Sequence, residues 1–155
     1  MSKTRRIETP QGSIIRTKNG MSCHLKWNEG FKERWRGKID NAQKYVDSEC
    51  IRRMDPYTPM LSGMLIKSAT LGTKIGEGKI HQIAPYAKYQ YYGKLMVSST
   101  TGSPWSKGEK KVLTDIDLKH NKSAHPLAGP FWFERMKADH WRNILDGAQK
   151  YAERG

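Results

Sequence analysis

Cysteine is scarce in this 155-residue chain, which contains only Cys23 and Cys50. Two cysteines are too few for a disulfide framework, so we expect both thiols to be reduced and buried as small apolar side chains. Long apolar runs are also missing, and none approaches the roughly 18 residues that cross a membrane. The basic start of the chain is not followed by an apolar stretch, so we expect no secretory signal and synthesis that ends in the cytosol.

Clusters of catalytic or metal-binding residue types are rare as well. His24 stands beside Cys23, but no second pair completes a tetrahedral zinc site. Gly72, Gly76 and Gly78 lack the Lys-Ser/Thr that follows a phosphate-binding loop, so they are interpreted as turn glycines. We therefore expect no metal, no cofactor and no enzymatic activity.

Acidic residues are few, with 15 Asp and Glu against 28 Lys and Arg, and the formal net charge is +13. Such a charge attracts nucleic acid and other polyanions at long range. No zinc-finger, RNA-binding or helix-turn-helix pattern organises the basic residues, however. They either contact phosphates directly or form solvated faces that meet acidic partner proteins. The candidate contact residues are Arg5, Arg6, Lys107, Lys110, Lys111, Lys119 and Lys122.

The chain divides into a flexible basic tail over residues 1–12 and a single domain over residues 13–155. Asn19-Gly20 lies between two alternating runs and predicts a β-hairpin over residues 13–27, because both turn residues accept positive φ. One face of the second strand, with Met21, Cys23, Leu25 and Trp27, is expected to look inward.

A long helix is predicted next. Apolar residues recur at spacings of three and four from Phe31 to Met54, Asn28 stands where an N-cap is expected, and Pro56 ends the pattern. We interpret the apolar stripe as core rather than as a partner surface.

Shorter elements follow. Residues 61–69 predict a brief helix, and residues 70–75 and 79–83 predict a strand pair joined by a glycine-rich turn. Tyr86, Tyr89 and Tyr92 recur at the spacing of a short helix whose rings lie on the sheet, and Gly93 ends that helix.

A polar, turn-rich region extends from Lys94 to Gly129, and only residues 112–118 alternate like a strand. A connection of this length without core residues is unusual inside a compact domain, so we interpret residues 94–129 as a projecting arm or hairpin, called the arm below. Trp105 and Trp132 lie at its two ends. They either clamp the arm or each fill core.

The last predicted element is a helix that Pro130 starts, with an apolar stripe facing the long helix or the sheet. Together the patterns predict an α+β fold. A small antiparallel sheet packs against a long N-terminal helix and a C-terminal helix, with a long projecting loop or hairpin arm.

Three short phrases, in a fixed order, resemble a known family. Their matching positions are Pro59, Ser62, Gly63, Leu65 and Ser68, then Tyr86, Ala87, Tyr89 and Gly93, then Pro130 and Phe131. This order resembles the minor capsid and tail-completion proteins of long-tailed bacteriophages, over roughly residues 21–153. In that family a Thr is usual where Ser62 stands, and an acidic residue is frequent where Tyr91 stands.

The resemblance implies a structural protein of the virion neck, assembled in the cytoplasm of a bacterial host. Its subunits would form a ring, of six copies or alternatively twelve, that joins the DNA-filled head to the tail. The implied partners are further copies of the chain, a head-closure or adaptor protein, a tail-terminator or tail-tube protein, and genome DNA in the channel, but no membrane. We expect residues 94–125 and the tail to order on assembly, so deletion of residues 98–122 should abolish rings while the monomer stays folded. The alternative is a free basic nucleic-acid-binding or toxin-antitoxin-like module.

Overall fold

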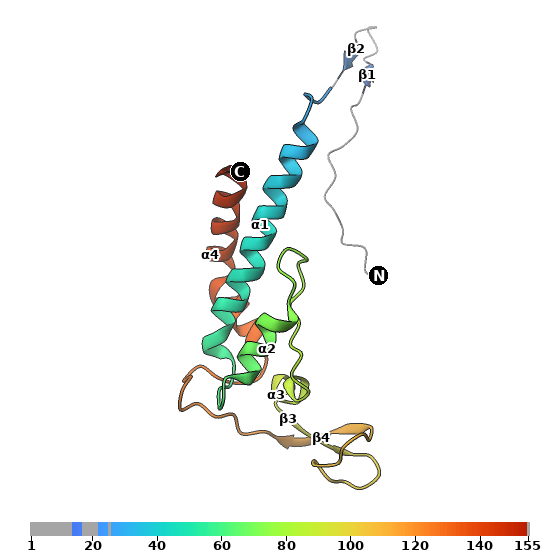
Figure 1. The fold of residues 1–155 in the computed structure, drawn as a ribbon, viewed down its shortest axis with the longest axis vertical. Helices are drawn as coiled ribbons and strands as arrows, with labels where there is room; N and C mark the ends of the chain where they lie inside the picture. The colour runs from blue at the N-terminus through green and yellow to red at the C-terminus, as the bar shows by residue number, and fades with distance from the viewer. Residues whose placement is uncertain (1–13, 17–21, 25, 155) are drawn as a thin grey trace.

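Two long antiparallel helices form the body of the protein; the shorter helices and one β-hairpin lie at one end of them, and a short N-terminal strand pair lies beyond the other end (Figure 1). The computed structural model describes residues 14–16, 22–24 and 26–154, so the predicted tail and the candidates Arg5 and Arg6 lie outside the described residues. The fold is α+β, as predicted. In chain order the elements are β1 (Ile14–Arg16), β2 (Ser22–His24), α1 (Phe31–Met54), η1 (Asp55–Tyr57), α2 (Met64–Gly72), α3 (Ala87–Tyr92), β3 (Lys94–Ser98), β4 (Lys111–Asp117) and α4 (Trp132–Arg154).

The predicted N-terminal strand pair is present. β1 and β2 pair antiparallel, with Ile15 opposite Cys23. The predicted turn at Asn19-Gly20 lies outside the described residues. So do Met21, Leu25 and the side chain of Cys23, which belong to the predicted inward face, whereas Trp27 of that face is 37% exposed.

Helix α1 begins two residues later than an Asn28 cap would place it. Gly30 precedes the helix with a φ of 73°, a left-handed conformation that glycine adopts without strain. Asn28 contributes its backbone carbonyl, which accepts the N–H of Phe31 at 3.1 Å, and no side chain caps the helix. The predicted cap was therefore wrong, whereas the end of α1 before Pro56 was predicted correctly.

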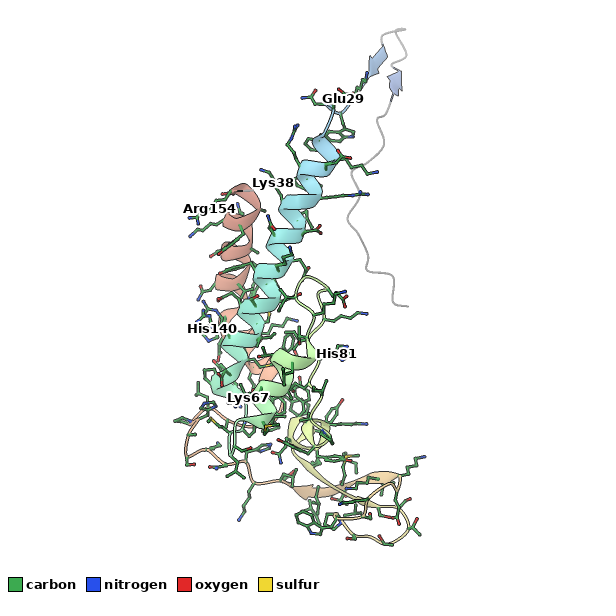
Figure 2. The ribbon with its side chains drawn as sticks, in the orientation of Figure 1. Glu29, Lys38, Lys67, His81, His140 and Arg154 are labelled. Atoms are coloured by element: carbon green, nitrogen blue, oxygen red, sulfur yellow. The ribbon has the colours of Figure 1, made fainter. Side chains whose placement is uncertain are left out.

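The core lies between the C-terminal half of α1 and the N-terminal half of α4. Its buried residues are Met54, Tyr57, Leu65, Ala69, Ala87, Trp132, Met136 and Ile144. The N-terminal part of α1 extends past the end of α4, and Figure 2 shows Glu29 well beyond the level of Arg154. Trp35 is accordingly 39% exposed, so the apolar stripe of α1 is core only over its second half.

The predicted strand pair over residues 70–75 and 79–83 was wrong. Helix α2 continues to Gly72, and residues 73–85 contain no strand. Residues 73 and 81 do lie side by side, but they are not paired backbone to backbone as in a sheet. Instead the backbone N–H of His81 donates to the Thr73 hydroxyl at 3.0 Å. Gly72 permits this approach, because a Cβ there would lie 2.6 Å from the carbonyl oxygen of His81.

The arm contains a β-hairpin that projects from the helices (Figure 1). β3 and β4 pair antiparallel, Ser98 lies opposite Lys111, and an irregularity between Lys94 and Met96 shifts the register. At the base of the hairpin the backbone N–H of Leu118 donates to the carbonyl of Gly93 at 2.8 Å. Both strands of the hairpin are thus fixed at one place on the body.

Trp105, in the arm, and Trp132, just after it, differ in burial. Trp132 is 1% exposed and fills the core, while Trp105 is 88% exposed on the loop between β3 and β4. Neither predicted alternative therefore holds for the pair. Helix α4 begins at Trp132 rather than at Pro130, because Phe131 adopts a φ of 51° and breaks the helical geometry before it.

Candidate assembly surfaces

The first motif phrase forms the start of α2. Gly63 precedes the helix with a φ of 75°, and Leu65 is buried in the core. The hydroxyl of Ser68 is buried and donates to the carbonyl of Leu65 at 2.7 Å. Pro59 is buried and Ser62 is exposed. These residues turn the chain from α1 into α2 and hold α2 against the core.

The second phrase forms α3 and its end. Ala87 is buried, Tyr86 is partly exposed, and Tyr89 lies under the ammonium group of Lys111 at 5.4 Å. Gly93 ends α3 with a φ of 64°. A Cβ on Gly93 would lie 2.9 Å from Cβ of Pro130, so the close contact requires glycine.

The third phrase packs directly on the second. The N–H of Phe131 donates to the carbonyl of Tyr91 at 2.8 Å. The Tyr91 ring meets the rings of Phe131 and Trp132 edge to face, with centroids 5.5 and 4.8 Å apart. The rings of α3 thus pack on the start of α4, where a sheet was expected. Tyr91 thus makes aromatic contacts to both residues that begin α4 and its approach.

A small hollow links the first two phrases. It encloses about 290 Å³ and is bordered by residues 59–65 together with Tyr86, Gln90, Lys119 and Asn121. The three phrases therefore meet around α3. The phrases connect α1 to α2, α3 to β3, and the arm to α4. Lys119 is the one basic candidate that lines this hollow.

The other described basic candidates lie on or near the arm. Lys107 and Lys110 are exposed on the loop between β3 and β4, and Lys122 is exposed after β4. Lys111 is partly buried, because its ammonium group donates to the carbonyl of Pro104 at 2.8 Å. The five described candidates are spread along the chain: Lys107 and Lys110 lie in the loop at the free end of the hairpin, Lys111 begins β4, and Lys119 and Lys122 lie in the segment that follows β4.

Large apolar side chains are exposed on several elements. The arm exposes Trp105, Val112, Leu113 and Ile116, α2 and its approach expose Leu61, Met64 and Leu71, and α4 exposes Trp141, Leu145 and Tyr151. On the projecting end of α1, the rings of Trp27, Phe31 and Trp35 stack in parallel with centroids 4.7 and 6.2 Å apart. On the arm the sequence gives no warning, because a single apolar residue on a polar segment carries no periodic signal. On α1 and α4 the apolar stripes were predicted, but part of each stripe is exposed instead of facing inward.

A second feature missed by the sequence is a larger cavity of about 430 Å³ between α1, residues 78–82 and the start of α4. Its walls are mainly apolar and aromatic: Val46, Cys50, Met54, Ile80, Tyr91, Trp132 and Phe133, with Gln43, Asp47, Gly78 and Gln82. Burial raises the pKa of the half-buried Cys50 thiol, and it also raises the pKa of the Tyr91 hydroxyl. Neither group is activated as a nucleophile, since a reactive thiol needs a lowered pKa.

A partly buried polar cluster lies where α1 ends beside α4. The Tyr57 hydroxyl donates to the Asp139 carboxylate at 2.6 Å, and His140 lies between Tyr57 and Arg53, 3.3 Å from each. The hydrogen bond to Asp139 raises the pKa of Tyr57. Tyr57 is therefore kept protonated, and its hydrogen bond links the segment after α1 to α4. A tyrosine in this state is a poor general base.

Over residues 14–16, 22–24 and 26–154, no group of three His, Cys, Asp or Glu side chains is arranged to hold a metal ion. In the same residues no helix is long and apolar enough to span a membrane. Comparison with known protein families, with characterised proteins and with solved structures finds no match to this chain.

Proposed function

We propose that this protein is a non-enzymatic structural subunit of the neck of a long-tailed bacteriophage. Copies would form a ring, of six subunits or alternatively twelve, that joins the DNA-filled head to the tail. Its neighbours in the virion would be a head-closure or adaptor protein on one side and a tail-terminator or tail-tube protein on the other. Two kinds of support are the motif phrases that meet around α3 and the distribution of apolar surface.

The observation that carries the proposal is the imbalance between a small core and many exposed apolar side chains. Eight residues form the buried core cluster, whereas Trp105, Leu61 and Leu71 are 88%, 90% and 73% exposed. Single exposed apolar side chains are common on monomers, but here large ones gather on the arm, with Trp105, Val112, Leu113 and Ile116, and on the approach to α2, with Leu61, Met64 and Leu71, where burial against a neighbour would be favourable. A subunit whose surface is completed by its neighbours accounts for this.

The arm supports the same proposal. In the described part of the chain β3 and β4 pair only with each other, so each strand has one edge with unsatisfied backbone groups. Such edges accept strands from other chains. A ring further requires that two different surfaces meet head to tail, and a projecting hairpin provides a surface unlike the rest of the subunit.

Shortening the arm tests the proposal without unfolding the body. Because the N–H of Ser99 donates to the carbonyl of Lys110, replacing residues 100–109 by Asn-Gly closes the hairpin with a tight turn and keeps both strands. The expected result is a monomer with unchanged helical circular dichroism that no longer forms rings and no longer joins heads to tails in a mixing assay.

Thr100→Ala is the matched control, since Thr100 is an exposed residue of the same loop, and it should assemble like the original chain. Electron microscopy of particles, with this subunit labelled, should place it between head and tail. Location elsewhere, or head–tail joining that is unaffected by the shortened arm, would contradict the proposal.

The net charge leaves two uses for the basic residues within the ring. Exposed lysines such as Lys107 and Lys122 would contact genome phosphates in the channel or acidic surfaces of neighbouring proteins. Binding to double-stranded DNA that weakens steeply between 50 and 200 mM salt would favour phosphate contact. Absence of a shift at low salt would favour protein partners.

A further inference from the structure

We infer that copies of this chain join through one aromatic side chain: Trp105, on the arm of one copy, inserts into the 430 Å³ cavity of the next copy. This contact would be the head-to-tail joint of the proposed ring, and the inference rests on that proposed function for its biological setting. Both parts of the contact are present in every copy, so each subunit provides one Trp105 and one cavity.

Trp105 carries an uncovered indole on a loop whose backbone is held by hydrogen bonds. Its backbone N–H donates to the Ser103 hydroxyl at 3.2 Å, and the Lys111 ammonium group donates to the carbonyl of Pro104 at 2.8 Å. The indole itself is 88% exposed. Because the backbone is already held, insertion has to fix only the two side-chain torsions of Trp105, and tryptophan is enriched at the energetic centres of interfaces.

The cavity matches an indole in size and chemistry. Its volume of about 430 Å³ lies in the range of roughly 300–1,000 Å³ that is usual for ligand pockets. Tyr91, Trp132 and Phe133 line it with aromatic rings, and aromatic pairs gain from edge-to-face and offset contacts. Trp105 of the same copy is not among the residues that line the cavity.

Charge distinguishes this cavity from two other hollows in the described part of the chain. Its lining includes Asp47 and no Lys or Arg side chain. Lys119 lines one of the other hollows, and Lys150 and Arg154 line the second.

The loop that carries Trp105 is basic. Lys107 and Lys110 extend from it, and neither makes an ion pair with another described residue. Two copies that each carry a formal charge of +13 repel each other, so a basic loop is best accepted where cations are fewest. Of these three hollows, the 430 Å³ cavity is the one whose lining contains a carboxylate and no Lys or Arg; the exposed Lys79 lies beside it, between Gly78 and Ile80 in the chain.

The arm has the reach that the contact needs. The five residues of β3 advance about 17 Å from the body, which takes the loop clear of its own helices. The side chain and the cavity are different surfaces, so the contact is heterologous and its repetition generates a ring or a filament.

A photo-crosslink tests the contact directly. Trp105 is replaced by the aromatic crosslinker p-benzoylphenylalanine, and equal amounts of ¹⁵N-labelled and unlabelled protein are mixed, irradiated and digested. We expect crosslinked peptides of mixed isotopic origin that map to residues 43–54, 78–82 or 132–133. The same substitution at Trp141, which is partly exposed on α4, is the matched control and should not reach these residues.

Complementation provides a second test that does not depend on the crosslinker. Trp105→Ala lacks the inserted side chain and Ile80→Trp fills the cavity, so neither variant should assemble alone. Trp105→Ala should weaken self-association by about 30-fold or more, which is typical of a central tryptophan. Mixed one to one, the two variants should form a heterodimer through the one intact pair of surfaces. If Ile80→Trp fails to fold, the crosslinking result decides.

Each outcome separates the contact from the proposed function. Normal self-association of Trp105→Ala, or crosslinks that stay within one copy or map elsewhere, overturns the inference. If the shortened arm abolishes head–tail joining while Trp105→Ala does not, the proposed function stands and the inference falls. If copies crosslink through the cavity but the protein is absent from phage particles, the inference stands and the proposed function falls.

Discussion

The carboxylate of Asp47 accepts a hydrogen bond of 2.7 Å from the backbone N–H of Gly76, although 29 residues separate them in the chain. The same oxygen accepts the N–H of Gly78 at 3.1 Å, and the other oxygen accepts the side-chain amide of Gln43 at 2.7 Å. Asp47 is 3% exposed. One buried carboxylate therefore holds the loop that closes one side of the cavity.

Asp47→Asn is expected to lower the free energy of unfolding by about 2–3 kcal/mol, because hydrogen bonds to a charged acceptor are replaced by weaker or clashing amide contacts. Urea unfolding followed by circular dichroism measures this. Asp40→Asn, at an exposed position of the same helix, is the control and should change stability by less than about 0.5 kcal/mol. Equal effects of the two variants would contradict the role of Asp47.

Gly93 and Gly102 form a matched pair for a second prediction. Both have a positive φ, 64° and 67°, but a Cβ on Gly93 would lie 2.9 Å from Pro130, whereas nothing lies within 4 Å of a Cβ on Gly102. Gly102→Ala should cost about 1–2 kcal/mol from backbone strain alone. Gly93→Ala should lower the free energy of unfolding by a larger amount, measured by thermal or urea unfolding. The difference between the two variants gives the energy of the close contact between Gly93 and Pro130. A smaller cost at Gly93 would show that Pro130 moves away freely.

Trp105 and Trp132 are expected to differ in their effects on stability. Trp132→Ala empties part of the core and should cost about 3–5 kcal/mol. Trp105→Ala should change the stability of the monomer by less than about 0.5 kcal/mol, since the side chain is exposed. Unfolding measured at a concentration where the protein is monomeric compares them, and a large loss for Trp105→Ala would show that its indole packs within its own chain.

Glu49 predicts a pH dependence. Hydrogen bonds from Arg52, and then from Arg53, lower the pKa of Glu49 from 4.5 to about 2. Because the pKa is lower in the folded state, the stabilisation is complete above about pH 4.5 and is lost as the pH falls through about 2.

Glu49→Gln should cost about 1 kcal/mol at pH 7, because Arg52 is largely exposed and its ion pair is screened by water. The variant should also lose less stability than the original chain between pH 5 and pH 2. Urea unfolding at pH 7, 5 and 3 measures both effects, with the exposed Glu33→Gln as control. A pH profile of Glu49→Gln that parallels the original would contradict the prediction.

The helices were predictable because each one repeats a simple pattern. The spacing from Phe31 to Met54 and the end at Pro56 predicted α1, and the tyrosines after Pro85 predicted α3. The exposed end of α1 was not predictable, because a stripe of apolar residues is the same whether α4 covers it or ends before it. Only the length of α4 and the direction of its packing decide that Trp35 is left uncovered.

The strand pair over residues 70–83 was wrong for a local reason. Thr70 favours a strand by its intrinsic propensity. The helix nevertheless continues to Gly72, because Leu65, Ser68 and Ala69 are buried on one side of α2 and their packing stabilises the helical conformation. The cavity was equally invisible in the sequence, since its walls come from three separated segments. A signal for Asp47 did exist: an acidic residue beside Val46 in an otherwise apolar stripe, with two turn glycines later in the chain.

The base of the arm has a mechanical consequence. Leu118 is bonded to Gly93, the His120 ring lies 2.8 Å from the carbonyl oxygen of Gln90, and Gly93 rests on Pro130. These contacts fix the hairpin to the body at its base and leave its other end free. A force on the free end would therefore be carried through α3 and Pro130 into the two long helices.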